Sequence, residues 1–236
     1  MTRTLALLHT VSSLIPTFQQ LCQELLPDAE TFHMVDESLL KNTIRSGELT
    51  PTTTRRVLGH VASAEEGGAD AVLVTCSSIG PAVALSRSVV SVPVVRVDEA
   101  MADLAVQMGS RIGVIATLPT TLHPTADLVR ARADAVGAPV TVTAHLCTGA
   151  FEALGRGDTA AHDALIADGL RQLLGNVDVI VLAQASMARV ADTLPEEDRR
   201  VPILSSPRSG VERARTVLLG ASDDKPASPA DRAPAH

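Results

Sequence analysis

One sequence pattern occurs twice in this 236-residue chain, with an offset of about 108 residues. The run that begins at Asp70, Asp-Ala-Val-Leu-Val-Thr-Cys-Ser-Ser-Ile-Gly, aligns with the run that begins at Asp178, Asp-Val-Ile-Val-Leu-Ala-Gln-Ala-Ser-Met-Ala. Ser13-Leu-Ile-Pro-Thr aligns in the same way with Thr121-Leu-His-Pro-Thr. Two further matches keep the order: Arg45-Ser-Gly-Glu with Gly155-Arg-Gly-Asp, and Val92-Pro with Val201-Pro. A repeat of this length predicts two halves of similar structure, arising by internal duplication.

Within each half, short apolar runs alternate with longer segments rich in Ala and Leu, which is typical of parallel sheets built from βαβ units. The strands predicted from these runs are Leu5–Leu8, Thr31–Val35, Ala71–Thr75, Val92–Val97, Arg111–Ala116, Val140–Ala144, Val179–Ala183 and Pro202–Leu204. The predicted helices include Pro16–Leu26, Thr53–Glu66, Glu99–Met108, Pro124–Val136, Ala160–Leu174 and Gly210–Leu219. The sequence therefore predicts an α/β fold of two pseudo-symmetric lobes, each a parallel sheet flanked by helices.

The repeat also suggests where the lobes begin and end. We expect residues 1–98 together with 205–220 to form the first lobe and residues 99–204 to form the second. Residues 221–236 are rich in Ala, Pro, Asp and Ser without apolar periodicity, so we expect a disordered tail there.

Composition excludes several classes of partner. The chain has three Phe and no Tyr or Trp, so its core must be aliphatic, and aromatic platforms that stack on nucleic-acid bases are not expected. Its net charge of −7 argues against a polyanionic partner. No apolar run approaches the roughly 20 residues of a membrane span, and the first apolar stretch is shorter than a signal peptide requires. We therefore expect a cytoplasmic protein that binds neither nucleic acid nor membrane.

Ligands of open parallel sheets bind beyond the carboxyl ends of the strands, so the turns that follow the predicted strands mark the candidate site. These turns are dense in hydroxyl groups, and the N–H groups of a helix N-terminus can bind a carboxylate without Lys or Arg. No GxxxxGK[ST] or GxGxxG motif supports nucleotide binding, so a small carboxylate is the expected ligand. The candidate substrate-binding residues are Thr10, Ser12, Thr75, Ser77, Ser78, Thr117, Thr121, Gln184, Ala185 and Ser186.

Of the three cysteines, Cys76 has the context of a reactive thiol, because it ends a strand immediately before a hydroxyl-rich turn. A thiol at a helix N-terminus is expected to have a lowered pKa. The alternative is that Cys76 is a small buried apolar residue, as free cysteines often are. We expect Cys22 and Cys147 to be core residues, and we expect no metal site, because the histidines lack metal-ligand spacing. His9 and His145 end strands and are candidates either for packing or for the site.

With these residues assembled, the chain resembles the aspartate/glutamate racemase superfamily, close to its Asp/Glu/hydantoin racemase branch. The resemblance lies in Val-Leu-Val-Thr-Cys76-Ser-Ser, in the matching Val-Leu-Ala-Gln184-Ala-Ser-Met, in Ile-Gly-Val-Ile-Ala-Thr117, and in the Val-Pro-Val-Val run before Asp98. It implies a cofactor-independent isomerase that binds a carboxylate between its lobes, with a tendency to form homo-oligomers. It also implies two cysteines on opposite faces of the substrate α-carbon, of which Cys76 is the first.

The second of these cysteines is replaced by Gln184, and an amide cannot exchange a proton with carbon. Three reactions remain open for a site with one thiol. Cys76 can act as the acid/base of an amino-acid racemase or isomerase in which His145 or water serves the other face. It can instead protonate the product of a malonate-type decarboxylation, as a lyase, or attack an activated carbon covalently. A non-catalytic carboxylate-binding protein is a further alternative.

Overall fold

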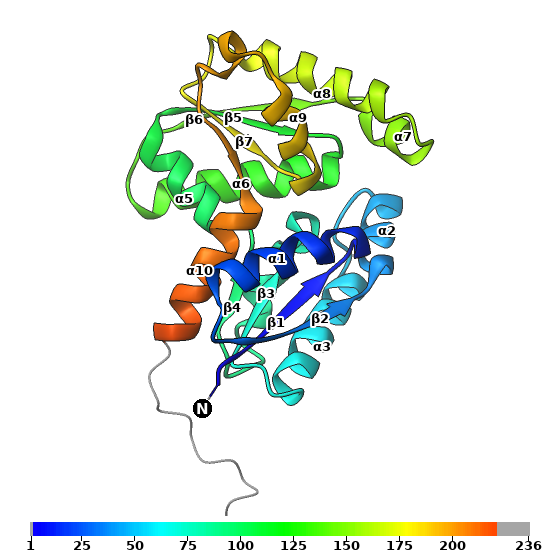
Figure 1. The fold of residues 1–236 in the computed structure, drawn as a ribbon, viewed down its shortest axis with the longest axis vertical. Helices are drawn as coiled ribbons and strands as arrows, with labels where there is room; N and C mark the ends of the chain where they lie inside the picture. The colour runs from blue at the N-terminus through cyan, green and yellow to red at the C-terminus, as the bar shows by residue number, and fades with distance from the viewer. Residues whose placement is uncertain (1, 221–236) are drawn as a thin grey trace, which may run out of the picture.

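The computed structural model describes residues 2–220, so the tail predicted at residues 221–236 lies outside the described residues. It confirms the predicted fold class, with two four-stranded parallel sheets flanked by helices (Figure 1). The sheet of the first lobe has the order β2-β1-β3-β4, formed by β1 (Thr4–His9), β2 (Glu30–Val35), β3 (Ala71–Val74) and β4 (Val94–Arg96). The sheet of the second lobe has the order β6-β5-β7-β8, formed by β5 (Arg111–Ala116), β6 (Thr141–Leu146), β7 (Val179–Leu182) and β8 (Ile203–Ser205).

The central strands of both sheets are apolar because helices cover both of their faces. All four residues of β3 and all four of β7 are buried. Their register is also equivalent, since Leu5 of β1 pairs with Ala71, and Ile112 of β5 pairs with Val179. The two sheets therefore correspond strand for strand in order and direction.

The helices cover the predicted segments and add several short ones that the sequence reading did not identify. The α-helices are α1 (Ile15–Leu25), α2 (Glu37–Ser46), α3 (Pro51–Glu66), α4 (Pro81–Ser86), α5 (Glu99–Met108), α6 (Pro119–Ala135), α7 (Ala150–Gly155), α8 (Thr159–Leu173), α9 (Ala188–Thr193) and α10 (Ser206–Gly220). Single 3-10 turns are η1 (Ser12–Leu14), η2 (Ser77–Ile79), η3 (Ala185–Met187) and η4 (Glu196–Arg199).

Two of these helices differ instructively from the prediction. Helix α6 begins at Pro119 and contains Pro124, whereas the sequence placed its start at Pro124. Pro119 suits a first helical turn because its missing N–H needs no partner there. Helix α2 was not predicted, although Asp36 caps it by accepting a hydrogen bond from the Ser38 N–H, and Gly47 ends it with φ of 72°.

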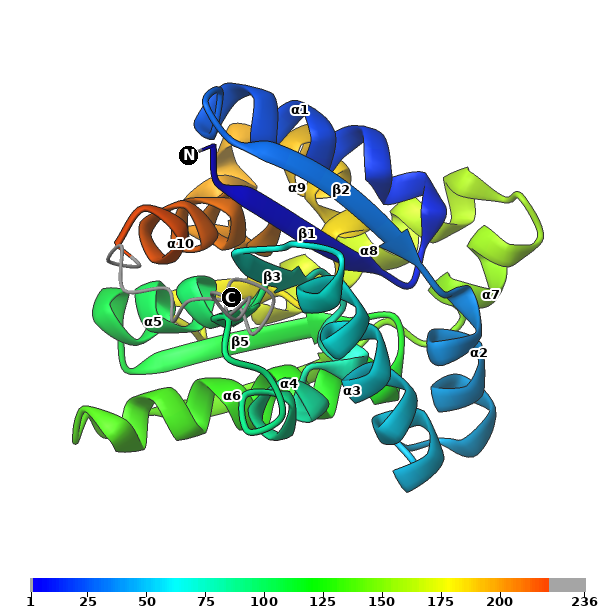
Figure 2. The same cartoon turned by 90° about the horizontal axis from the view of Figure 1, so that it is seen from below.

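The last helix of each half packs on the sheet of the other half. Helix α10 joins α1 over the first sheet, where Val211, Ala214 and Leu218 are buried in the same core as Leu5 and Leu7. Helix α5 joins α6 over the second sheet, with a core of its own. The two exchanged helices also contact each other, and Figures 1 and 2 show them side by side. This exchange ties the lobes together and fixes how their strand ends face each other.

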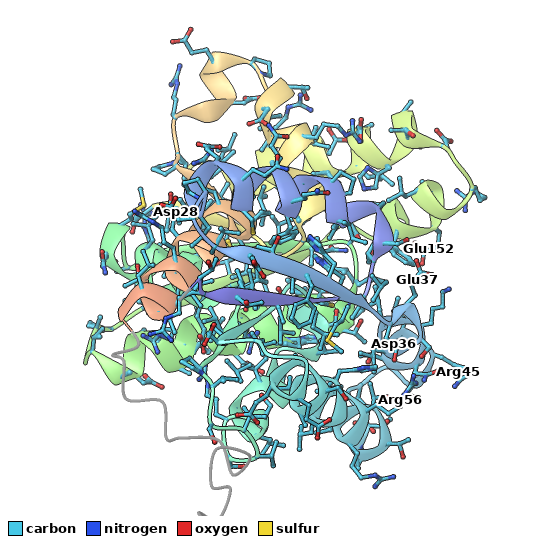
Figure 3. All side chains as sticks on the ribbon, turned by 60° about the horizontal axis from the view of Figure 1, so that its bottom comes forward. Asp28, Asp36, Glu37, Arg45, Arg56 and Glu152 are labelled. Atoms are coloured by element: carbon cyan, nitrogen blue, oxygen red, sulfur yellow. The ribbon has the colours of Figure 1, made fainter. Side chains whose placement is uncertain are left out.

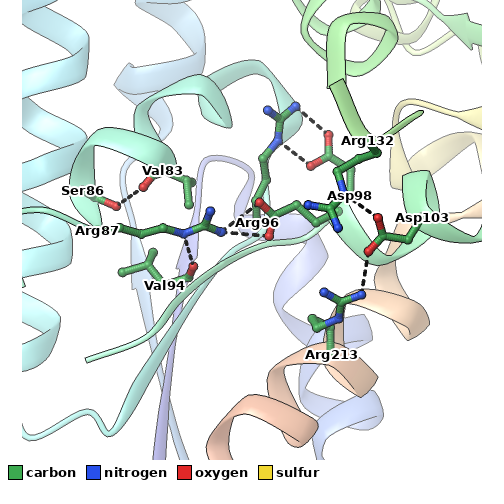
Figure 4. A network of polar contacts seen from close by, with 10 residues as sticks. Val83, Ser86, Arg87, Val94, Arg96, Asp98, Asp103, Arg132 and Arg213 are labelled. Carbon is green, nitrogen blue, oxygen red and sulfur yellow. Dashed lines mark hydrogen bonds and ion pairs between the residues drawn. The ribbon is translucent and has the colours of Figure 1, made fainter. Parts of the chain in front are cut away.

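A buried ion pair lies at this junction (Figure 4). Arg96 donates from Nε and Nη2 to the two carboxylate oxygens of Asp98, at 2.6 and 2.9 Å, and from Nη2 to the backbone carbonyl of Pro124 in the second lobe, at 3.1 Å. Asp98 directly precedes helix α5, but its side chain makes no capping hydrogen bond there. Nearby, Asp103 of α5 accepts from Arg132 of α6 and Arg213 of α10.

Within residues 2–220, the structure contains no helix with the length and apolar character needed to span a membrane.

Candidate active site

The carboxyl ends of strands from both sheets face one cavity of about 180 Å³ between the lobes. Every residue predicted for the site lines this cavity except Ser12. The predicted residues brought together are Thr10, Thr75, Cys76, Ser77, Ser78, Thr117, Thr121, Gln184, Ala185 and Ser186.

Ser12 does not reach the cavity. Its hydroxyl donates to the carboxylate of Glu37 at 2.7 Å, and both side chains are exposed. Ser13 lines the cavity in its place. The prediction was wrong by one position because η1 turns the chain through a single 3-10 turn, in which neighbouring side chains point in different directions.

Cys76 stands at the point where β3 gives way to the turn η2. Its backbone is extended, with φ of −126° and ψ of 118°, and η2 begins with the next residue. The side chain is half-buried and borders the cavity. The thiol therefore lies where a ligand between the lobes would meet it.

The predicted lowering of the Cys76 pKa is wrong. Burial raises the pKa of the thiol above its usual value, and this effect exceeds the opposing hydrogen bonds from the Thr10 hydroxyl and from the Ser78 and Ile79 N–H groups. The Ser78 hydroxyl opposes it as well. A 3-10 turn of three residues has a much smaller dipole than a full helix, so it does not outweigh the loss of solvation. The resting thiol is therefore protonated near neutral pH.

Gln184 occupies the equivalent place at the end of β7 in the second lobe. Its Oε1 accepts two hydrogen bonds from Thr117, one from the backbone N–H at 2.6 Å and one from the hydroxyl at 3.0 Å. In the first lobe, Thr10 has the corresponding relation to Cys76, whose thiolate it favours. Thr10 Oγ1 is buried, and within residues 2–220 it makes no hydrogen bond to a nitrogen or oxygen atom, so its interaction is with the Cys76 thiol.

A hydrogen bond joins the two lobes at the cavity wall. The hydroxyls of Ser78 in η2 and Thr121 in α6 lie 2.7 Å apart, and both residues are buried. Because the Ser78 hydroxyl also hydrogen-bonds the Cys76 thiol, the Thr121 hydroxyl is the donor to Ser78. The contact also fixes the η2 turn, which supplies N–H groups beside Cys76, against the opposite lobe.

Thr75 borders the cavity, but its hydroxyl hydrogen has another partner. Thr75 Oγ1 donates to the backbone carbonyl of Leu8 at 3.0 Å and lies 3.0 Å from Nδ1 of His9, whose Nε2 in turn lies 2.8 Å from Nδ1 of His33. The direction of the first bond makes His9 Nδ1 the donor to Thr75 and His33 Nδ1 the donor to His9. His9 therefore supports the cavity wall from behind and does not line the cavity. Thr75 is correspondingly a poor donor for a substrate.

The other candidate residues lie away from the cavity. Cys22 and Cys147 are core residues, as predicted, and burial raises the pKa of each thiol to about 11. His145 and Cys147 pack against Gly169 of α8, where a Cβ would lie within 3 Å of both side chains. His145 is therefore not placed to act on the second face of a substrate. Among the described residues, no group of His, Cys, Asp and Glu side chains gathers to bind a metal ion.

The sequence reading missed the apolar part of the cavity. Helices α2 and α7 lie on the same side of the molecule, and Figure 3 labels Glu37 and Glu152, one on each. From these helices come Leu40, Phe151 and Leu154, and no sequence signal placed them near the strand ends. Ser206, by contrast, directly follows β8, so it could have been predicted from the rule that ligands bind beyond the carboxyl ends of parallel strands. Val11, Ser13 and Leu118 lie in the strand-end turns expected at the site, although they were not among the candidate residues. The lining residues from outside those turns are Leu14, Leu40, Phe151, Leu154, Ala183 and Ser206.

The lining as a whole is uncharged. Within residues 2–220, no Asp, Glu, Lys, Arg or His side chain borders the cavity, and Cys76 is the titratable side chain of its lining. Hydroxyls, one amide and backbone N–H groups supply all of its polarity. The site is consequently built to donate hydrogen bonds, and it offers no acid to pair with a cation.

Comparison with known proteins identifies relatives along nearly the whole described chain. The family model described as Asp/Glu/Hydantoin racemase matches residues 8–214. A hydantoin racemase from Pseudomonas sp. (strain NS671) is 30% identical over 175 residues, which are 72% of this chain and 67% of that protein. The structure of a putative Asp/Glu racemase from Yersinia pestis superposes with a TM-score of 0.72 and 17% identity, covering 92% of this chain and 100% of the other. A variant of arylmalonate decarboxylase superposes with a TM-score of 0.58 and 18% identity, covering 95% and 97%.

Proposed function

Because the chain belongs to the Asp/Glu/hydantoin racemase family, we propose that it is a cofactor-independent isomerase in which Cys76 exchanges the proton on a carbon next to a carbonyl group. The observation that carries the proposal is the position of Cys76, which borders the cavity between the lobes among hydroxyl and N–H donors. A lone titratable group in such a setting suits proton transfer to and from carbon.

The uncharged lining of the cavity restricts which class of substrate can bind. A free α-amino acid carries an ammonium group, and burying it here without an anionic partner would cost several kcal/mol. A hydantoin ring carries no ammonium group, and its carbonyl oxygens and N–H groups match the hydroxyl and amide groups of the lining. The relationship to a hydantoin racemase supports the same choice. We therefore propose a neutral cyclic amide of the hydantoin type as substrate, with its apolar substituent against Leu40, Phe151 and Leu154.

The chemistry requires only the thiol and hydrogen-bond donors. The Cys76 thiol first loses its proton to solvent, which becomes more frequent as the pH rises. The thiolate then accepts the α-proton, and the electron pair of the broken C–H bond forms the C=C bond of an enolate. The carbonyl π electrons move to oxygen, where donors stabilise the new charge. Return of the same proton, or of one exchanged with solvent, reverses every step.

A single thiol also predicts the stereochemical outcome. Gln184 cannot return a proton from the second face, so exchange at the Cys76 face proceeds with retention, and inversion depends on water reaching the other face. We expect solvent deuterium to enter the α-position faster than the enantiomer appears. A racemase with two thiols would lose chirality about as fast as it gains deuterium.

The test is incubation of the protein with the hydantoin derived from L-leucine in deuterated water. NMR follows loss of the α-proton signal, and chiral chromatography follows the enantiomers. Cys76→Ala should abolish exchange, while Cys22→Ala, a buried cysteine away from the cavity, serves as the matched control. Exchange that persists in Cys76→Ala would refute the proposal. Binding of the hydantoin without any exchange would identify a non-catalytic binding protein.

The raised pKa of Cys76 favours a second candidate, a lyase that decarboxylates a malonate-type acid. Loss of carbon dioxide leaves the enolate without any need for a base, and a protonated thiol is then the group required to deliver a proton to carbon. Release of carbon dioxide from phenylmalonate or methylmalonate, measured beside the hydantoin assay, distinguishes the two reactions.

A further inference from the structure

The amide of Gln184 has only one orientation consistent with its neighbours. The backbone N–H of Thr117 points at one end of the amide from 2.6 Å, and a backbone N–H can only donate. The atom facing it must therefore be the oxygen, Oε1. The Thr117 hydroxyl donates to the same oxygen, at 3.0 Å.

Gln184 borders the cavity, and the two donors from Thr117 engage only its oxygen. Within residues 2–220, no protein group hydrogen-bonds the amide nitrogen Nε2. The hydrogen bonds to the oxygen set the plane of the amide and so the direction of its two N–H bonds. A donor that is already oriented before the ligand arrives loses little freedom when it binds.

The acceptor that would pair with this nitrogen must belong to the substrate. Gln184 extends from β7 of the second lobe and Cys76 from β3 of the first, at equivalent strand ends across the cavity. A planar substrate between them would meet the thiol from one lobe and the amide from the other. Since the lining contains no charged donor, neutral donors of this kind must carry the charge stabilisation.

We propose that Gln184 is a catalytic residue whose amide N–H donates to the substrate carbonyl oxygen that becomes negatively charged as the α-proton leaves. This inference rests on the proposed function of Cys76, and it identifies the substrate as a compound with a carbonyl oxygen directed at the second lobe. At this position, Gln184 replaces the second cysteine that the resemblance implies. The site therefore has one proton-transferring thiol and, in place of the second, a hydrogen-bond donor that stabilises the enolate. Thr117 acts as a positioning residue, because it holds the amide oxygen and so aims the nitrogen.

Two substitutions distinguish the hydrogen-bond donation of the Gln184 amide from the size and shape of its side chain. Gln184→Met keeps much of the side-chain length without any N–H, and Gln184→Glu keeps an oxygen for Thr117 but turns the cavity-facing group into an acceptor. We expect each to lower kcat for deuterium exchange into the leucine-derived hydantoin by about 10²-fold, as removal of one oxyanion donor does. Gln20→Met, on the exposed face of α1, is the matched control and should leave the rate unchanged.

These variants can refute the role of Gln184 without refuting the role of Cys76. If Cys76→Ala abolishes exchange while Gln184→Met and Gln184→Glu stay within about threefold of the unmodified protein, the role of Gln184 is overturned and that of Cys76 stands. Iodoacetamide labelling of Cys76 in each Gln184 variant checks that the thiol remains in place.

A second measurement does not depend on turnover. In protein with isotope-labelled glutamine side chains, the Gln184 amide signal is the one missing from the spectrum of Gln184→Met. Addition of the hydantoin should shift this signal, and Thr117→Val should weaken the shift by releasing the amide oxygen from one donor. A Gln184 amide signal unmoved by saturating hydantoin would overturn the inference, whatever the activity.

Discussion

The buried histidine behind the cavity, His9, and the half-buried His33 stacked on it should make the stability of the protein depend on pH. His9 is fully buried, between the ring of Phe18 in edge contact at 5.5 Å and the stacked ring of His33 at 5.1 Å. Burial, with a smaller contribution from His33, lowers the pKa of His9 from 6.5 to about 4. The folded protein therefore keeps His9 neutral at pH values where the unfolded chain protonates it.

The sign and size of the effect follow from this difference. Below pH 6.5 the unfolded state binds a proton that the folded state does not bind, so stability is complete above that pH and is lost as the pH falls towards 4. Linkage over this interval gives a loss of about 2 kcal/mol between pH 7 and pH 5 from His9 alone. Burial lowers the pKa of His33 as well, so its contribution has the same sign.

Urea denaturation at pH 7, 6 and 5, followed by circular dichroism, measures the predicted slope. His9→Ala should lower stability at every pH, because it leaves a cavity beside Phe18, but it should also remove about 2 kcal/mol of the pH dependence. His123→Ala, which removes an exposed histidine of α6, is the control and should keep the slope. A slope that is equally steep with and without His9 would refute the reasoning.

Three further predictions concern the lobe junction and the thiol. Asp98→Ala leaves the Arg96 guanidinium buried without its carboxylate and should cost about 3–5 kcal/mol in urea denaturation; a loss below about 1 kcal/mol would contradict the buried-pair argument. Gly210→Ala should destabilise by about 1–3 kcal/mol, because a Cβ there would lie 2.7 Å from the backbone oxygen of Val97, and a neutral result in thermal denaturation would contradict that close packing. Because burial raises the pKa of Cys76, hydantoin exchange should accelerate as the pH rises above neutrality, whereas decarboxylation, which needs the protonated thiol, should slow; a falling exchange rate over that range would exclude the thiolate as the base.

The sequence determined the fold class because its signals are local. Buried parallel strands need continuous apolar runs, and β3 and β7 show them within a few residues of the predicted bounds. The rule that ligands lie beyond strand ends then selected Cys76, Gln184 and most of the polar lining. The sequence repeat aligns Cys76 with Gln184 and so predicted that they occupy equivalent positions in the two lobes. That the repeat arose by internal duplication stays a prediction.

Tertiary structure decided the features that depend on contacts between distant segments. The apolar wall comes from α2 and α7, whose approach to the cavity follows from how the two lobes are held by the exchange of α5 and α10. Whether the side chain of Ser12 or that of Ser13 faces the cavity depends on the 3-10 turn η1, in which both residues lie. Most of all, the sequence placed Cys76 at a helix start and so predicted a lowered pKa, whereas desolvation between packed lobes raises it. Residue order along the chain encodes strand ends and hydrogen-bonding groups, but the loss of water around a thiol is a property of the assembled surfaces.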